Sequence, residues 1–331
     1  MGGTTYDTLY NHTPARVTQY STVRYGRAVG CVFGGMMDNH MDPEDPTPRI
    51  DPTDPANIGD PSTHPANVLV RTDTTKRIQY MLSIDWTETS DNDLLATRLT
   101  QLQYVQFLEL SNSGLTDLSV LAVFRKLHTL YVNKTGVVDI SVLANFELLQ
   151  RFGARRTNIV DITVLSKCKF LTMLDLSKTK VVDIAPLSTC GNLGFLDLSN
   201  TEVGNILPLT TCANLRTLIM SETNVTDIST LSANTNLRVL DLMFTKVANV
   251  SALSACAKLS RLYLRETMVV DIFPLSACVK LTLLDLAHTM VNDISGLAAC
   301  KRLRVLLLYK TRVTDTTALS HLVPHGLWIS Q

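Results

Sequence analysis

Threonine recurs at a strict interval of 22 residues through most of the chain, and this period constrains the fold more than any other feature. The nine threonines are Thr135, Thr157, Thr179, Thr201, Thr223, Thr245, Thr267, Thr289 and Thr311. Leucine keeps the same period at Leu121, Leu143, Leu165, Leu187, Leu209, Leu231, Leu253, Leu275, Leu297 and Leu319. A fixed period of this length predicts a solenoid of stacked coils, each in contact only with its neighbours.

One unit, residues 171–192, reads LTMLDLSKTKVVDIAPLSTCGN. Its Leu174-Asp175-Leu176 segment predicts a short strand with both leucines facing inward, and the strands of successive coils pair in parallel. We expect the threonine hydroxyl to bond the backbone of the next coil. We expect the Asp or Asn of the following Asp-Ile segment to cap a short helix or 3₁₀ turn. The prolines Pro186, Pro208 and Pro274 fit the first turn of that helix.

Six cysteines share one repeat position, which is filled by Phe124, Phe146 and Leu322 in other coils. The six are Cys168, Cys190, Cys212, Cys256, Cys278 and Cys300. A position that accepts Phe, Leu and Cys is apolar and interior, so we expect buried, reduced thiols. The alternative is a disulfide between adjacent coils.

The repeats fill only part of the 331 residues. We expect an extended, proline-rich arm at 1–76, a strand-and-helix cap at 77–104, ten coils at 105–322 and a closing cap at 323–331. The arm interleaves aromatic residues with arginines, a combination that anchors protein partners. Its candidate partner-binding residues are Tyr6, Tyr10, Arg16, Tyr20, Arg24, Tyr25 and Arg27. The alternative is an idle disordered tail.

The segments VVDIAPL (181–187) and VVDIFPL (269–275) resemble leucine-rich repeat proteins, most of all the SDS22-like class shared with bacterial internalins. Threonine stands where that family usually has asparagine. This threonine-and-cysteine variant is similar to leucine-rich repeat proteins of kinetoplastids. The resemblance implies an α/β solenoid, with a curved parallel sheet and short convex helices or 3₁₀ turns. It also implies that the concave sheet binds other proteins, without enzymatic activity.

No motif for phosphate, dinucleotide, zinc or calcium binding is present, and His321 and His325 are separated by Pro324 without a third ligand nearby. The formal net charge is zero, which gives no general attraction to nucleic acid or to an acidic membrane. We therefore expect a non-enzyme without cofactor, metal or small-molecule substrate.

The outward residues of the strands are the candidate partner-binding surface. The register makes Tyr131, Phe195, Phe244, Tyr263 and Tyr309 exposed aromatics. Stacked aspartates favour a basic partner, and an ordinary solvated face is the alternative. The full set of candidates is Tyr131, Arg155, Arg156, Asp175, Phe195, Asp197, Asp241, Phe244, Tyr263, Arg265, Asp285 and Tyr309.

The function that follows is a structural, protein-binding scaffold within a large assembly. We expect a cytoplasmic, cytoskeletal setting in a cilium or flagellum, with tubulin or axonemal proteins as partners. The alternative is an SDS22-like regulatory adaptor, such as a phosphatase regulator or a ligase substrate adaptor.

Overall fold

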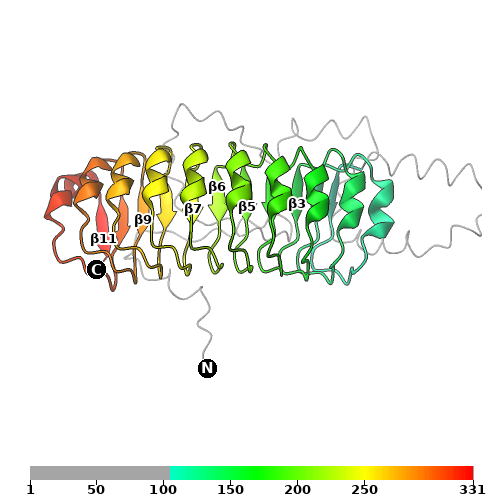
Figure 1. The fold of residues 1–331 in the computed structure, drawn as a ribbon, viewed down its shortest axis with the longest axis horizontal. Coiled ribbons are helices and arrows are strands. Elements are labelled where there is room, and N and C mark those ends of the chain that lie inside the picture. The colour runs from blue at the N-terminus through cyan, green and yellow to red at the C-terminus, as the bar shows by residue number, and fades with distance from the viewer. Residues whose placement is uncertain (1–104, 331) are drawn as a thin grey trace, which may run out of the picture. The chain divides into compact units, whose positions relative to one another are not determined.

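The computed structural model describes residues 105–330, and these residues form a leucine-rich solenoid with a curved sheet (Figure 1). Eleven short strands pair in parallel in chain order, each in register with the strand one coil later. They are β1 (Phe107–Glu109), β2 (Thr129–Tyr131), β3 (Arg151–Gly153), β4 (Met173–Asp175), β5 (Phe195–Asp197), β6 (Thr217–Ile219), β7 (Val239–Asp241), β8 (Arg261–Tyr263), β9 (Leu283–Asp285), β10 (Val305–Leu307) and β11 (Trp328–Ser330). The expected arm and N-terminal cap lie outside the described residues, so their boundaries stay predictions.

Opposite the strands, each coil carries one short 3₁₀ helix, as Figure 1 shows. The helices are η2 (Ser119–Val123), η3 (Ser141–Asn145), η4 (Thr163–Lys167), η5 (Ala185–Thr189), η6 (Leu207–Thr211), η7 (Ser229–Ala233), η8 (Ser251–Ala255), η9 (Phe273–Ala277), η10 (Ser295–Ala299) and η11 (Thr317–His325). Pro186, Pro208 and Pro274 stand in the first turn, as predicted. There the missing proline N–H costs no helical hydrogen bond.

The Asp and Asn side chains before these helices accept a hydrogen bond from the backbone N–H two residues later. Asp227 accepts from Ser229 at 2.8 Å, and Asn249 accepts from Ser251 at 2.8 Å. The capping prediction is right only in part: the Asp or Asn binds the N–H of the first helical residue, but it does not stand at the N-cap position, where no side-chain capping bond is made. The capping residue precedes the residue at the helix boundary, Ile228 or Val250, whose own side chain is buried.

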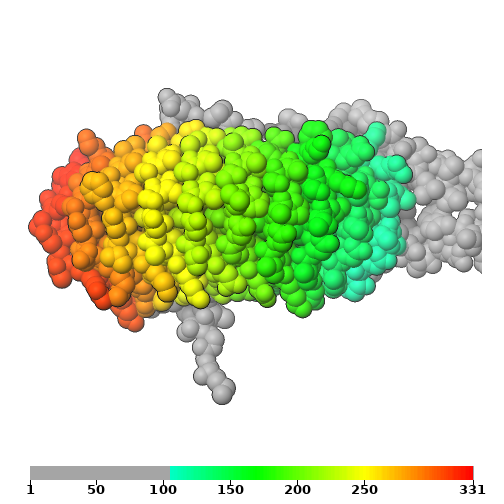
Figure 2. All heavy atoms as spheres, in the orientation of Figure 1, coloured from blue at the N-terminus to red at the C-terminus, as the bar shows by residue number. Residues whose placement is uncertain are grey.

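The leucines of each strand face a continuous interior. Leu174 and Leu176 are fully buried on either side of Asp175, as the alternating pattern predicts. The hydrogen-bonded strand begins one residue earlier than expected, at Met173. Successive coils bury the same positions against one another, and Figure 2 shows them stacked in contact from one end to the other.

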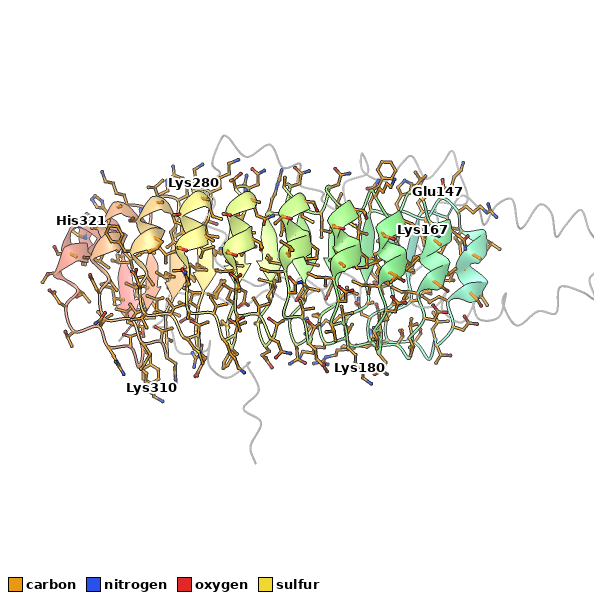
Figure 3. All side chains as sticks on the ribbon, viewed as in Figure 1. Glu147, Lys167, Lys180, Lys280, Lys310 and His321 are labelled. Atoms are coloured by element: carbon orange, nitrogen blue, oxygen red, sulfur yellow. The ribbon has the colours of Figure 1, made fainter. Side chains whose placement is uncertain are left out.

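The turn after each strand places one residue in the left-handed region. Ten non-glycine residues have positive φ there, at 22-residue spacing: Asn112, Lys134, Arg156, Lys178, Asn200, Glu222, Phe244, Glu266, His288 and Lys310. This conformation turns the backbone N–H toward the next coil, so that Lys178 donates to the Ser199 carbonyl at 2.8 Å. Figure 3 shows Lys180 and Lys310 along this rim, and Glu147 and Lys280 along the opposite one.

The periodic threonine does not bond the next coil, so that expectation is wrong. Thr179 donates its hydroxyl hydrogen to the Leu176 carbonyl, three residues earlier in its own turn, at 2.6 Å. The carbonyl of residue i−3 is already within reach of the short side chain, because the left-handed residue folds the turn back. Backbone bonds join the coils instead, for example from the Lys180 N–H to the Ile159 carbonyl at 2.9 Å.

The six repeat cysteines are buried and free, which confirms the interior reduced thiols and not the disulfide alternative. Their sulfurs point at backbone carbonyls of the preceding coil, such as Cys212 Sγ to Leu187 O at 3.6 Å. Asn234 occupies the same column and donates to the carbonyls of Leu209 and Cys212 at 3.0 and 2.9 Å. The cysteines are therefore small interior groups that also act as weak donors.

Candidate protein-interaction face

We call the outward side of the strands the sheet face. It consists of the first and third residues of each strand and the residue two positions beyond the strand. Parallel in-register pairing stacks the third residues into one column. From β3 to β10 this column reads Gly153, Asp175, Asp197, Ile219, Asp241, Tyr263, Asp285 and Leu307.

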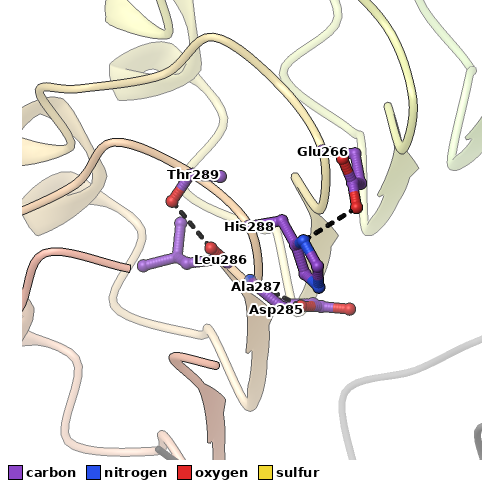
Figure 4. Close-up of polar contacts among 6 residues, drawn as sticks. All are labelled: Glu266, Asp285, Leu286, Ala287, His288 and Thr289. Carbon is purple, nitrogen blue, oxygen red and sulfur yellow. Dashed lines mark hydrogen bonds and ion pairs between the residues drawn. The ribbon is translucent and has the colours of Figure 1, made fainter. Parts of the chain in front are cut away.

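Each aspartate of the column folds back on its own strand end. Asp175, Asp197, Asp241 and Asp285 each accept the backbone N–H two residues later, at 2.9 Å in every case. Figure 4 shows this bond for Asp285 and Ala287. This bond satisfies one carboxylate oxygen, Oδ1, and the second oxygen, Oδ2, takes no part in it.

Three of these acids are buried although they occupy outward strand positions. Asp197 is 8% exposed, and Asp241 and Asp285 are 1% exposed. Burial raises the pKa of Asp197 to about 6, of Asp241 to about 7 and of Asp285 to about 6. The pKa of Asp175 is also raised, chiefly by burial. The sheet face therefore holds carboxyl groups whose charge costs free energy near neutral pH.

Two arginines moderate this cost for part of the column. Arg155 lowers the pKa of Asp175 and Asp197, and Arg265 lowers that of Asp285. Both arginines are half-buried and stand two residues beyond their strands, as predicted. For Asp241 the charged groups that act are Asp197, Asp285 and Glu222, and all three raise its pKa further.

The aromatic candidates take three different positions. Tyr131 lies over Gly153, where an added Cβ would stand 2.6 Å from its ring, and its hydroxyl reaches the sulfur of Met173 at 3.6 Å. Phe195, the first residue of β5, is half-buried. The expectation that Tyr263 is exposed is wrong, because only 9% of it is accessible where it stands in register between Asp241 and Asp285.

At the C-terminal end of the column, Tyr309 is 50% exposed and meets the His288 ring edge-on, with centroids 5.4 Å apart. Lys310 Nζ lies 5.3 Å from the centre of the Tyr309 ring. His288 Nδ1 contacts Glu266 Oε1 of the preceding coil at 2.9 Å (Figure 4). This cluster of an exposed tyrosine, a lysine and a histidine–glutamate pair was not predicted as a unit.

Arg156 and Phe244 do not lie on the sheet face with the other candidates. Both occupy the left-handed turn position, with φ of 56° and 57°, and both are exposed on the rim. Ile219 and Met243, which flank Asp241 on the sheet face, were not among the predicted partner-binding candidates. The candidate arm residues lie outside the described part of the chain.

Within residues 105–330, no group of three or more His, Cys, Asp or Glu side chains is arranged to hold a metal ion. None of the helices in this part of the chain is long and apolar enough to cross a membrane.

Three solved structures illustrate the similarity of this fold. An internalin (InlF) of Listeria monocytogenes is 20% identical, with a TM-score of 0.64, over 81% of this chain and 97% of that one. Internalin C2 of the same organism is 27% identical, with a TM-score of 0.54, over 56% and 82%. The ectodomain of the Arabidopsis thaliana receptor kinase GASSHO1/SCHENGEN3, in complex with Casparian strip integrity factor 2, is 17% identical, with a TM-score of 0.53, over 68% and 32%.

The family description "Leucine Rich repeats (2 copies)" matches residues 213–255. The search of characterised proteins finds no match. The periodic coils and the long parallel sheet define a solenoid, a class of protein whose sheet forms one extended surface. The chain therefore has the leucine-rich repeat fold, and its residues 213–255 match the model of that repeat family; proteins with this fold are typically non-catalytic modules that bind other proteins.

Proposed function

We propose that this protein is a structural scaffold that binds a protein partner on its sheet face, across β3 to β10. The observation that carries the proposal is the column of buried, partly uncompensated carboxyl groups flanked by Arg155, Arg265 and Tyr309. Stacked like charges destabilise a free sheet. A partner that supplies opposite charge and apolar contact offsets this cost on binding.

The candidate residues provide what a protein interface requires. Arginine and tyrosine dominate the binding energy of typical interfaces, and Arg155, Arg265 and Tyr309 lie on one side of a rigid sheet. The plant receptor ectodomain, which has the same type of solenoid, is seen in complex with Casparian strip integrity factor 2.

The test is affinity measurement with partners identified by cross-linking in intact cells. Replacing Arg155 and Arg265 by alanine should weaken binding about tenfold or more, since hot-spot truncation costs about 2 kcal/mol. The matched control replaces Lys167 and Lys301, exposed residues away from the strands, and should change affinity little. Equal effects of both pairs would contradict the proposal.

We place the scaffold in a large cytoskeletal assembly, with ciliary or flagellar microtubule proteins as partners. What supports this setting is the combination of a rigid solenoid with an arm rich in tyrosine and arginine. A structural subunit remains with the detergent-insoluble cytoskeleton at fixed stoichiometry. Recovery of the protein in the soluble pool would instead support the regulatory adaptor.

A further inference from the structure

Asp241 differs from the other acids of the column in its hydrogen bonding. Its side chain is 1% exposed, and Oδ1 accepts the Met243 N–H at 2.9 Å. Its second oxygen, Oδ2, is buried and has no hydrogen-bond partner. A buried carboxylate oxygen without a donor is unfavourable for the free protein, so its presence needs an explanation.

The charges around Asp241 make the position more unfavourable. Asp197 and Asp285 of the column and Glu222 of the rim all act against its ionisation. In the next strand, Arg261 acts on Tyr263, while Arg265 acts on Asp285. Among the four aspartates of the column, Asp241 is the one for which no arginine appears as a compensating charge.

The walls of this position are apolar. Ile219 in β6 and Tyr263 in β8 are the in-register neighbours of Asp241, and they are 5% and 9% exposed. Met243, two residues beyond β7, is 4% exposed. A charge pair formed between such walls is strengthened by the low local dielectric, and an aromatic neighbour suits a planar guanidinium.

We propose that Asp241 is the docking point for one arginine side chain of an extended segment of a partner protein, between Ile219 and Tyr263. This inference rests on the proposed binding function of the sheet face and names the chemistry that the face recognises. A guanidinium supplies donors for Oδ2, and it keeps its charge when removed from water. The partner's arginine would then compensate the charge of Asp241, as Arg155 compensates that of Asp197 and Arg265 that of Asp285.

The probe is an array of short peptides that each carry one central arginine, together with the same peptides carrying citrulline, which has nearly the same shape and no charge. The full-length protein should bind a subset of the arginine peptides, and citrulline should weaken each by about tenfold or more, because it leaves the buried acid unpaired. Asp241→Asn should cause a similar loss. Asp175→Asn, which changes an acid already beside Arg155, should cause a clearly smaller one.

Two further readouts separate recognition from a purely structural role. The ¹³C signal of the Asp241 carboxyl should titrate at lower pH when an arginine peptide is bound. Free Asp241→Asn protein should melt at the same temperature as wild type at pH 8, or higher, because the change removes an unfavourable buried charge.

The inference is overturned if no peptide shows arginine-dependent binding, if Asp241→Asn binds as wild type does, or if that variant melts well below wild type at pH 8. Binding of the cellular partners to the same variants distinguishes a failure of this inference from a failure of the proposed function. If they still depend on Arg155 and Arg265 but not on Asp241, the docking point is wrong and the binding face stands. If they depend on none of the three, both fail.

Discussion

Thr245 donates its hydroxyl hydrogen to the Leu242 carbonyl at 2.7 Å, in a turn where only 4% of the threonine is exposed. Each periodic threonine, from Thr135 in the first of these turns to Thr311 in the last, makes the same bond to the carbonyl three residues earlier. Every turn therefore uses a threonine hydroxyl to satisfy a backbone carbonyl. Thr245→Val keeps the shape and removes the donor. We expect the free energy of unfolding, from urea denaturation, to fall by about 1–2 kcal/mol.

The matched control is Thr226→Val, an exposed position that holds Val160 and Val182 in other coils. It should change stability by less than about 0.5 kcal/mol. Equal effects of the two substitutions would show that the buried hydroxyl does not stabilise the turn.

Lys178 adopts a φ of 58°, and its side chain is exposed. Because a Cβ is unfavourable in this conformation, Lys178→Gly should raise the free energy of unfolding by about 0.5–1 kcal/mol. Lys180→Gly, two residues later and outside the positive-φ positions, should lower it by about the same amount. Changes of the same sign in both variants would contradict the strain that we assign to the turn.

The buried acids predict how stability depends on pH. Their raised pKa values mean that folded Asp197, Asp241 and Asp285 hold protons that the unfolded chain, with a pKa of about 3.9, has already lost. Their contribution is present below the unfolded pKa and is lost as the pH rises through about 6 to 7. We expect the melting temperature to fall between about pH 4.5 and 7.5.

Other groups act in the opposite direction. The pKa of His288 is lowered, so this residue favours higher pH, but it is one group against the four column aspartates, whose pKa values are all raised. The capping aspartates with lowered pKa lose their contribution only as the pH falls below about 4. These are Asp117, Asp161, Asp227, Asp293 and Asp315. Asp241→Asn should flatten the decline above pH 5, and a melting temperature that rises from pH 5 to 7.5 would contradict the buried-acid account.

The cysteine column predicts slow thiol chemistry. Burial raises the pKa of Cys168 and Cys278 to about 12 and of Cys212, Cys256 and Cys300 to about 11. Ellman's reagent requires an accessible thiolate, so the reaction rate in native protein should be limited by unfolding. The seventh cysteine of the sequence, Cys31, lies outside the described residues, so it is replaced by serine. This Cys31→Ser protein should react only slowly at pH 8 and show all six remaining thiols in denaturant. Rapid reaction of any of the six would contradict their burial.

The period alone predicted that each coil holds one strand and one helical turn, and it placed the strands to within one residue, because every coil repeats the same apolar spacing. It failed for Thr179, since spacing does not show which of two nearby carbonyls a hydroxyl reaches. It also failed for Tyr263, because alternation gives the direction of a side chain but not what surrounds it. Asp241 lacks a compensating arginine because Arg155 and Arg265 stand in other coils and act on other aspartates. This difference between the aspartates can be recognised only once the coils are stacked in space.

Site-specific photo-crosslinking tests the central claim most directly. The photoreactive residue p-benzoylphenylalanine is placed at Thr217, on the sheet face in β6, or at Ser232, on the opposite side in η7. With full-length protein in cells, we expect strong partner crosslinks from Thr217 and few from Ser232. Crosslinks confined to Ser232 would show that the partner binds the helical side, and would contradict the sheet face as the binding surface.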